Sequence, residues 1–284
     1  MKRNFGVFIL THGRAKNVST VKTLRKCGYR GKIYIIIDDE DAQEQEYKDI
    51  YGESVIKFCK QKYIEQTDSM NPQKPRNVVV YARNATHDIA KEIGLTHFLV
   101  LDDDYKVFEW KIIEENKFKG KSFKNMDAVI EPILDFLDVS GALTVAMAQG
   151  GDFIGGKDGG FYGKKIARKA MNSFFCRTDR PFKFMGAINE DTNAYTVLGN
   201  RGKLFFTITN ISLTQGQTQK NAGGLTEAYL DSGTYIKSFY TVMLCPSSVK
   251  IKEMGNKYKR IHHAIKWKYT VPKIISYKWK KEGE

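Results

Sequence analysis

The sequence predicts an α/β fold, in which a mixed, mainly parallel sheet is flanked by helices and followed by a basic carboxyl-terminal extension. Two observations lead to this prediction. Apolar, β-branched runs alternate with stretches of helical spacing through the first hundred residues. Several of these runs also end in carboxylates, which is typical of an α/β sheet that binds its ligand at the carboxyl ends of parallel strands.

The first half of the chain is predicted to alternate between strands and helices. We expect strands over residues 5–11, 32–37, 54–58 and 97–101, and helices over residues 18–27 and 78–93. An acidic helix is expected after the second strand, and residues 66–76 are polar, contain proline and predict a loop.

The second half is less regular. A helix is expected over residues 126–139, with Pro132 near its start, and strands over residues 143–147, 172–176, 205–211 and 235–244. Residues 149–163 carry seven glycines and predict a mobile loop, and residues 215–224 predict a second one. No internal repeat or linker is visible, so a single domain over residues 1–284 is preferred.

Composition excludes several classes of protein. The chain has 284 residues, of which 42% are hydrophobic and 12% aromatic, enough to form a sizeable core and to exclude wholesale disorder. No apolar run is as long as a membrane-spanning helix, and the amino terminus resembles a first strand more than a signal peptide. The cysteines have no CxxC spacing, so we expect no zinc site and a reducing, cytoplasmic compartment: Cys27, Cys59, Cys176 and Cys245.

The net charge of +14 points to a polyanionic partner. Residues 245–284 contain eleven Lys or Arg and three Glu, so +8 of this charge lies in the last 40 residues. Aromatic residues interleave with these cations, a combination that suits nucleic acid: Tyr258, Trp267, Tyr269, Tyr277 and Trp279. The positions expected to contact DNA are Lys257, Lys259, Arg260, Lys266 and Lys268. A solvated basic tail or an anionic membrane surface is the alternative.

The most informative stretch is an apolar strand that ends in Asp102, Asp103 and Asp104. Residues i and i+2 of an extended chain face the same side, so Asp102 and Asp104 are expected to share Mg²⁺ or Mn²⁺, and Asp103 to point toward a sugar hydroxyl. A second acidic cluster, at Asp38 and Asp39, is expected to accept hydrogen bonds from a base or ribose. The alternative for either cluster is a polar strand end that caps the next helix.

The ordered set of motifs resembles the GT-A glycosyltransferases, which have a Rossmann-like fold and use nucleotide-sugar donors. The opening strand and its Thr–x–x–Arg turn read FILTHGRAKN, and the second strand reads IIIDDED. The segment YARNATHDIAKEIGLTHFLVLDDDY resembles the family's Ala-Arg-Asn helix, which leads into its Asp-x-Asp motif. The downstream Glu-Asp motif resembles Asn189-Glu190-Asp191, and the family's late histidine falls at His262 or His263.

Within that fold the chain is most similar to the TET-associated glycosyltransferases, a group chiefly from bacteriophages. The similarity rests on the THGR start, the DDDY strand end, the NEDTNAY segment and the basic carboxyl-terminal region. Membership implies sugar transfer, from a UDP-sugar in our prediction, to the hydroxyl of 5-hydroxymethylcytosine or another 5-hydroxymethyl-pyrimidine in DNA. The enzyme would then act in the cytoplasm of a bacterial host cell, with a nucleotide-sugar half over residues 1–125 and an acceptor half over residues 126–284.

The resemblance also implies roles for individual residues. The nucleotide-sugar would be held by Thr11, Arg14, Asp38, Asp39, Arg83 and Asp103. The metal, Mn²⁺ or Mg²⁺, would be held by Asp102 and Asp104 with His262 or His263. Asp191, with Glu190 as second choice, would be the general base that takes the acceptor's proton in an inverting reaction, or a stabilising group in a retaining one. A Glu-Asp pair that only caps a helix is the alternative.

Other functions remain as alternatives. A GT-A enzyme acting on a polysaccharide, lipid or protein would share every donor-site residue, and the basic tail is what favours DNA. A non-catalytic DNA-binding module is disfavoured by the intact acidic strand end. A P-loop enzyme is disfavoured because neither glycine-rich segment contains the GxxxxGK[ST] pattern, and a nucleotidyltransferase because no Gly-x-Gly signature opens the first strand.

Overall fold

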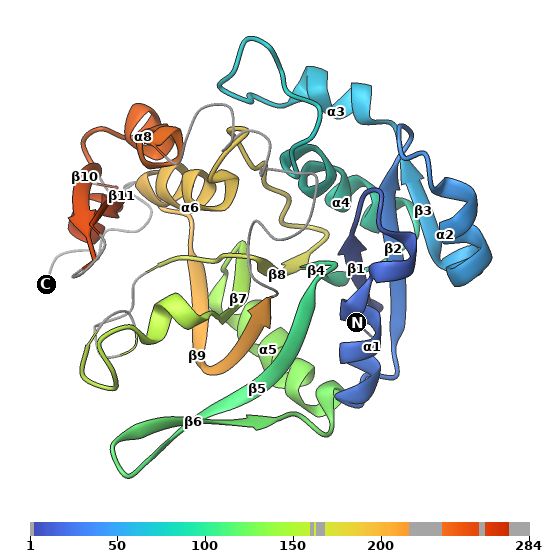
Figure 1. The fold of residues 1–284 in the computed structure, drawn as a ribbon, viewed down its shortest axis with the longest axis horizontal. Coiled ribbons are helices and arrows are strands. Elements are labelled where there is room, and N and C mark those ends of the chain that lie inside the picture. Colours follow the sequence, from blue (N-terminus) through green and yellow to red (C-terminus); the bar gives the residue numbers. More distant parts are fainter. Residues whose placement is uncertain (1–2, 160–161, 163–167, 216–234, 256–258, 273–284) are drawn as a thin grey trace, which may run out of the picture.

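A nine-stranded mixed sheet organises the part of the chain that the structure describes. The computed structural model describes residues 3–159, 162, 168–215, 235–255 and 259–272. The strand order is β3-β2-β1-β4-β8-β7-β9-β5-β6, in which β3, β2, β1 and β4 run parallel (Figure 1). The strands are β1 Phe5–Leu10, β2 Lys32–Asp38, β3 Val55–Phe58, β4 His97–Asp102, β5 Tyr105–Glu114, β6 Lys117–Ser122, β7 Thr144–Ala148, β8 Ser173–Arg177 and β9 Phe205–Gln215. This arrangement confirms the predicted fold class.

Helices cover the sheet, and a separate antiparallel hairpin lies beside them at the end of the described chain. The α-helices are α1 Ser19–Lys26, α2 Glu44–Tyr51, α3 Lys60–Gln66, α4 Val80–Glu92, α5 Met126–Ser140, α6 Glu190–Asn200 and α8 Tyr235–Leu244. The 3-10 helices are η1 Ala15–Asn17, η2 Gly52–Ser54, η3 Gly150–Phe153 and η4 Trp267–Tyr269. The hairpin consists of β10 Val249–Met254 and β11 Arg260–Ile265, and Figure 1 shows it next to α8 and α6, far from β1 and β2.

Two apolar cores lie on opposite faces of the sheet, because successive side chains of a strand point to opposite sides. In β1, Val7 and Ile9 pack in the core under α1, α2 and α5, whereas Phe8 and Leu10 pack in the core under α3, α4, α6 and α8. The near-continuous apolar sequence of β1 follows from its burial on both faces. No helix of the described residues is long and apolar enough to cross a membrane.

One predicted strand is wrong, because residues 235–244 form the helix α8. The segment is rich in aromatic and β-branched residues, which favour strands. Its exposed apolar residues, Phe239 and Met243, are four positions apart, and Ser238, Tyr240 and Thr241 are buried together. That spacing is helical rather than alternating. The hairpin β5–β6, the hairpin β10–β11 and the helix α3 were not predicted.

The described part of the glycine-rich segment that follows β7 is anchored. Asp152 is buried, accepts a hydrogen bond from the backbone N–H of Gln149 at 2.9 Å and pairs with Lys169. The rings of Phe153 and Tyr162 lie 5.1 Å and 4.8 Å from the ring of Phe118 on β6. This part of the segment is therefore fixed to the β5–β6 hairpin, where the sequence predicted a mobile loop.

A buried histidine on α4 predicts how stability depends on pH. His87 is 7% exposed, lies edge-on to Phe98 and Phe182, and has no hydrogen-bond partner among the described residues. Burial lowers the pKa of its imidazole from 6.5 to about 4. Between pH 6.5 and about pH 4, the unfolded chain therefore binds a proton at His87 that the folded chain does not bind. The free energy of unfolding falls as the pH falls through this range.

We expect His87→Phe, which keeps the ring and removes the titration, to be more stable than the wild type at about pH 5 by about 2 kcal/mol, from the linkage of one proton. Urea unfolding at about pH 5 and about pH 8 measures the difference. The value at the higher pH reports packing alone and is the control. Equal differences at the two pH values would contradict the prediction.

Candidate active site

The polar ends of three neighbouring parallel strands meet at one edge of the sheet. The register places Leu10 of β1 beside Asp102 of β4 and beside Ile36 of β2, so Thr11, Asp38 and Asp102 lie at the same edge. The β4 strand ends at Asp102, and Asp103 and Asp104 form the turn into β5. A turn, rather than the extended chain that the sequence suggested, therefore sets the directions of the three carboxylates.

Asp103 faces the turn that follows β1. Its carboxylate accepts a hydrogen bond from the Thr11 hydroxyl at 2.7 Å and one from the Arg14 guanidinium at 3.1 Å. The Tyr47 hydroxyl lies 3.0 Å from the Thr11 hydroxyl and accepts a hydrogen bond from the Arg14 backbone N–H at 2.8 Å. Gly13 has a φ of +65°, which favours glycine between these two residues. Thr11, Arg14 and Asp103 thus form one hydrogen-bonded network at the ends of β1 and β4.

Asp102 points to the opposite side, toward the second half of the chain. Its carboxylate lies 3.5 Å from the Arg83 guanidinium and accepts a hydrogen bond from the Gln215 amide at 3.1 Å. Its backbone carbonyl accepts a hydrogen bond from the Thr20 hydroxyl at 2.7 Å. Helix α1, helix α4 and the end of β9 therefore all hold this residue.

Arg83 is the buried cation at the centre of the site. Its side chain is 3% exposed, bonds to Glu190 and lies over the rings of Phe174 and Phe184, at 5.0 Å and 5.7 Å from their centroids. Burial opposes its charge, but Glu190, Asp102 and Asp191 outweigh burial and raise the pKa of Arg83. The guanidinium therefore neutralises the carboxylates around it, and its burial leaves little of its surface accessible to a ligand.

The carboxylates around Arg83 outnumber it. Burial raises the pKa of Glu190 and of Asp102; Arg83 opposes both shifts, and neighbouring carboxylates reinforce them. Burial, Asp102 and Asp103 together raise the pKa of Asp104 to about 6. The Oδ1 atom of Asp104 is also buried, with no hydrogen-bond partner among the described residues. A donor set of crowded carboxylates with an orphaned oxygen fits a hard divalent cation.

The two carboxylates at the end of β2 differ in their surroundings. Asp38 is buried and accepts hydrogen bonds from His12 Nδ1 at 2.8 Å and Lys60 Nζ at 2.9 Å. Burial opposes its ionisation, but these two partners outweigh burial and hold the pKa of Asp38 below its usual value. Asp39 is exposed, and one of its oxygens accepts a hydrogen bond from the Lys60 backbone N–H at 2.9 Å. Asp38 thus fixes the turn, while Asp39 is accessible.

The predicted catalytic pair lies in the first turn of α6. Glu190 bonds to Arg83, and both Glu190 and Asp191 are buried. Arg83 contacts both Glu190 and Asp102, which places the pair beside the end of β4. One oxygen of Asp191 accepts hydrogen bonds from the N–H of Thr192 at 2.6 Å and from its hydroxyl at 3.3 Å. The helix N-terminus further stabilises the two negative charges.

Comparison with known protein families identifies the family of the chain. The family model described as TET-Associated Glycosyltransferase matches residues 5–224. The chain belongs to this family. The match contains every predicted donor, metal and catalytic position except the two histidines. The predictions of a glycosyltransferase and of its family are thereby confirmed.

Solved structures resemble the chain more distantly, and no curated protein matches its sequence. TarS of S. aureus has a TM-score of 0.42 at 12% identity, over 74% of this chain and 36% of the TarS chain, so the match spans about a third of TarS. The glucosyl-3-phosphoglycerate synthase from Mycobacterium tuberculosis, solved with Mn²⁺, UDP and phosphoglyceric acid, has a TM-score of 0.47 at 10% identity. That match covers 93% of this chain and 87% of the synthase.

The predicted histidine ligands lie on the β10–β11 hairpin of this glycosyltransferase. The rings of His262 and His263 are 4.3 Å apart, and burial, followed by the charges around them, lowers the pKa of both. The cations that contribute are Lys237 for both rings and Arg260 for His262. Among the described residues, no three His, Cys, Asp or Glu side chains are spaced to hold a metal. The structure does not join these histidines to Asp102 and Asp104.

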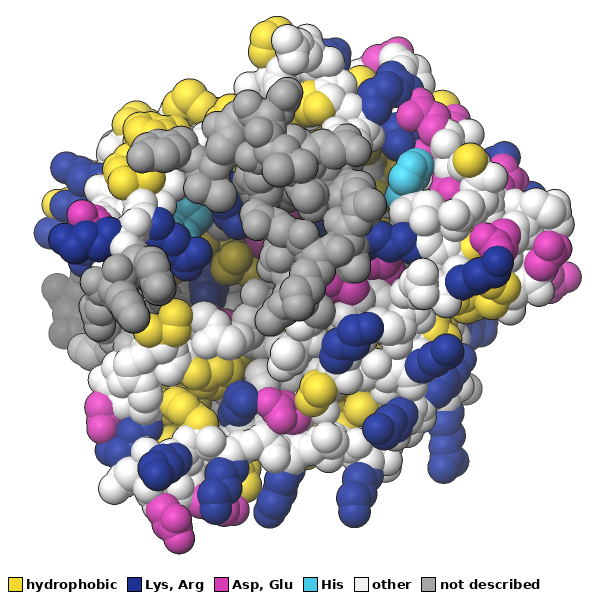
Figure 2. Space-filling model, in the orientation of Figure 1, with side chains coloured by type: hydrophobic (Ala, Val, Ile, Leu, Met, Phe, Trp, Pro, Cys, Tyr) yellow, Lys and Arg dark blue, Asp and Glu magenta, His cyan; other side chains and the backbone are white. Residues whose placement is uncertain are grey.

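The predicted DNA-contacting residues lie on or beside the same hairpin. Lys259 pairs with Glu253 at 3.0 Å, and Arg260, Lys266 and Lys268 are exposed. Figure 2 shows Lys and Arg side chains gathered over β10–β11. Lys257 lies outside the described residues, as do three of the interleaved aromatic residues, Tyr258, Tyr277 and Trp279.

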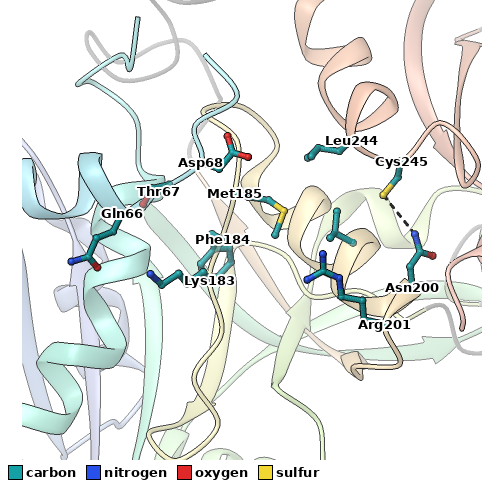
Figure 3. A pocket seen from close by; sticks show the side chains of 11 residues that line it. Gln66, Thr67, Asp68, Lys183, Phe184, Met185, Asn200, Arg201, Leu244 and Cys245 are labelled. Atoms are coloured by element: carbon teal, nitrogen blue, oxygen red, sulfur yellow. Dashed lines mark hydrogen bonds between the residues drawn. The ribbon is translucent and has the colours of Figure 1, made fainter. Parts of the chain in front are cut away.

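A cavity of about 560 Å³ lies at the far end of α6 from Glu190 (Figure 3). Residues of α6, α8 and the segment before α6 line it, among them Lys183, Phe184, Asn200, Arg201 and Cys245. The cavity nevertheless borders the surroundings of Arg83, because Phe184, which lines it, has its ring centroid 5.7 Å from the Arg83 guanidinium. None of the predicted site residues lines it.

Three residues that complete the site were not predicted from the sequence. Gln215 bonds to Asp102, Tyr47 organises the turn around Thr11 and Arg14, and Thr20 holds the backbone of Asp102. Each is an ordinary polar or aromatic residue within its own element, and no local signal distinguishes it. Only the register between distant strands and helices brings them to the site.

We expect Arg83→Met to destabilise the protein by about 3 kcal/mol or more, because it leaves the buried carboxylate of Glu190 and the partly buried carboxylate of Asp102 without their cation. Urea unfolding measures this loss. Arg14→Met removes a more exposed guanidinium from Asp103 and is the matched control, with a smaller loss expected. Adding Glu190→Gln to Arg83→Met should restore part of the stability. Equal losses in the two single variants would contradict the prediction.

Proposed function

We propose that the protein transfers a sugar from a nucleotide-sugar, UDP-linked, to the hydroxyl of 5-hydroxymethylcytosine in DNA, with Mn²⁺ or Mg²⁺. The observation that carries the proposal is the convergence of the acidic end of β4 with Glu190 and Asp191 at the start of α6. Family membership supplies the reaction class, and the basic surface supports a DNA acceptor. The site of action in this proposal is the cytoplasm of a bacterial host cell.

In this proposal the donor lies over the ends of β1, β2 and β4. Thr11, Arg14 and Asp103 already form a hydrogen-bonded network and would contact the nucleotide-sugar. Asp39 is the accessible carboxylate at the end of β2 and would accept hydrogen bonds from the ribose or base. Asp38 would act by fixing the turn, and Arg83 by holding the carboxylates.

Asp102 and Asp104 are the residues that would hold the divalent cation. The cation would neutralise charge on the departing diphosphate and so lower the barrier for its release. The raised pKa of Asp104 supports this assignment, since crowded carboxylates that resist ionisation are stabilised by a cation. His262 and His263 remain predicted ligands that the geometry does not link to these carboxylates.

Asp191 is the residue that would take the acceptor's proton. Transfer forms a bond between the anomeric carbon and the acceptor oxygen and breaks the bond from that carbon to the diphosphate. The hydroxyl is a poor nucleophile until a base removes its proton. Thr192 donates hydrogen bonds to one oxygen of Asp191, and the other oxygen, which accepts none from the described residues, would receive the proton. Glu190 is bonded to Arg83, which favours Asp191 over Glu190.

We expect Mn²⁺ to raise the melting temperature of the wild type, because a ligand that binds only the folded state stabilises that state. At a ligand concentration one hundred times Kd, the free energy of unfolding rises by about 2.7 kcal/mol. Asp102→Asn/Asp104→Asn should abolish this shift, as measured by differential scanning fluorimetry. Asp49→Asn/Glu53→Gln removes an exposed acidic pair on α2 and η2 and should keep the shift. A full shift in the first double variant would overturn the metal assignment.

We expect Asp191→Asn to lower the rate of sugar transfer by about 10²- to 10⁴-fold, the usual contribution of a general base. Mass spectrometry of hydroxymethylated DNA incubated with a panel of nucleotide-sugars gives the rate and also identifies the sugar. Calorimetric titration with UDP should show unchanged donor binding. Asp158→Asn, at an exposed carboxylate of the glycine-rich segment, is the control. A full rate in Asp191→Asn would refute the role.

The same experiment tests the acceptor. If the DNA stays unmodified while the protein hydrolyses a nucleotide-sugar in the presence of Mn²⁺, the acceptor is a polysaccharide, lipid or protein instead. If neither transfer nor hydrolysis occurs with any donor of the panel, the reading as a non-catalytic DNA-binding module gains support.

A further inference from the structure

The edge strand β6 carries a row of lysines on one face. Lys117, Lys119 and Lys121 occupy alternate positions of this strand, so they project to the same side about 6.6 Å apart. All three are exposed. We refer to these three residues as the lysine strip. It lies outside the carboxyl-terminal region where the sequence concentrates its positive charge.

The neighbours of the lysine strip leave its charge largely uncompensated. The register places Lys121 opposite Trp110, Lys119 opposite Ile112 and Lys117 opposite Glu114. Glu114 pairs with Lys119 at 2.8 Å, and no ion pair is found for Lys117 or Lys121 within the described chain. Trp110 is 41% exposed and thus adds an accessible aromatic ring to a cationic surface.

The opposite face of β6 is occupied, which turns the lysine strip outward. Phe118 projects from that face and packs against Phe153 and Tyr162 of the glycine-rich segment. Lys111 of β5, on the same face as Phe118, lies 5.4 Å from the centroid of the Phe153 ring. The lysine face is therefore the one that remains for a partner. Figure 2 shows Lys and Arg side chains in a row along the lower edge of the molecule, over the β5–β6 hairpin and α1.

The lysine strip is connected to the acidic site by a single strand. β5 begins at Tyr105, directly after Asp104, and runs to Trp110 and Glu114, the register partners of Lys121 and Lys117. Five residues of strand span about 17 Å and nine span about 31 Å. At about 3.4 Å per base pair, these lengths correspond to about five and about nine base pairs of a duplex.

We propose that the lysine strip binds the phosphate backbone of duplex DNA about five to nine base pairs away from the base that is modified. The proposal rests on the DNA acceptor proposed above and adds a second contact surface, apart from the β10–β11 hairpin. Evenly spaced ammonium groups neutralise phosphates without reading sequence, and they position a duplex rather than select its bases.

Lysines on an edge strand also prevent strands of different molecules from pairing, and this is the simplest alternative role. That role predicts no effect on DNA binding. Binding of the strip to phosphates instead predicts a defined loss in the salt dependence of affinity, since each neutralised phosphate contributes about −0.9 to the slope of log K against log salt.

The test measures binding of a fluorescent duplex of about 20 base pairs, roughly two helical turns, with one central 5-hydroxymethylcytosine. Fluorescence anisotropy over a series of salt concentrations gives the slope. Lys117→Ala/Lys119→Ala/Lys121→Ala should make the slope less negative by up to about 2.7 and lower the affinity at low salt more than tenfold. Lys57→Ala/Lys62→Ala/Lys91→Ala, which removes one exposed lysine from β3 at the opposite edge of the sheet and two from the helices α3 and α4, should keep both. Circular dichroism confirms that each variant is folded.

Duplex length provides a second readout. Shortening the duplex to about three base pairs on each side of the modified base removes the phosphates that the strip would reach, given about 3.4 Å per base pair. The wild type and the control variant should then bind more weakly, whereas the lysine-strip variant should lose less.

The outcomes distinguish this inference from the proposed function. If the wild type and the lysine-strip variant bind DNA with equal slopes, the strip is not a DNA surface, while the DNA acceptor stands. If the wild type binds no DNA, the DNA acceptor is wrong and the inference falls with it. If the variant loses binding to phosphatidylserine vesicles and keeps its binding to DNA, the strip is a membrane surface and the inference is overturned. The inference is supported if the slope of log K against log salt becomes less negative in the lysine-strip variant but not in the control variant.

Discussion

The burial of one cation, Arg83, is the constraint on which the site depends. A guanidinium that is 3% exposed must be paired, and its partners come from distant parts of the chain: Asp102 at the end of β4 and Glu190 at the start of α6. The pair therefore fixes α6 against the parallel half of the sheet. Because Asp104 and Asp191 add further carboxylates, one cation leaves the centre negative, and a second cation would relieve this excess.

Negative and positive charges are concentrated in different parts of the molecule. The carboxylates of the candidate site lie where parallel strands end, whereas two groups of surface cations lie on the β5–β6 and β10–β11 hairpins (Figure 2). A bare carboxylate centre would repel both a diphosphate and a DNA strand. In the proposed function the surface lysines would attract the polyanionic acceptor over the Debye length of about 8 Å, and the carboxylates would serve the transfer step, so the two tasks would fall to different parts of the molecule.

The parts of the fold that the sequence predicted are those with a local signal. β1, β2 and β4 are buried on both faces, so continuous apolar runs mark them, and the carboxylates at their ends mark the site. The helix α8 was predicted as a strand because its aromatic and β-branched residues favour strands, and tertiary packing against β11 and α6 outweighed that preference. The lysines of β6 and the amide of Gln215 gave no local signal at all. Their roles depend on register with β5 and on the end of β9 reaching Asp102, which no local pattern contains.

The hairpin β5–β6 links the acidic site, the glycine-rich segment and the outer surface. Its first residue follows Asp104, its inner face holds Phe153 and Tyr162, and its outer face carries the lysine strip. The glycine-rich segment in turn follows β7, whose last residue pairs with Ser212 of β9, and Ser212 donates a hydrogen bond to Glu109 of β5 at 3.3 Å. β5 pairs with β9 from Tyr105 to Trp110 and with β6 from Glu109 to Glu114, so one continuous strand joins the acidic site to the lysine strip. A duplex bound to the outer face of β6 would therefore be connected through β5 to the strand end that positions Asp104, and the register of β5 would set the spacing between the two sites.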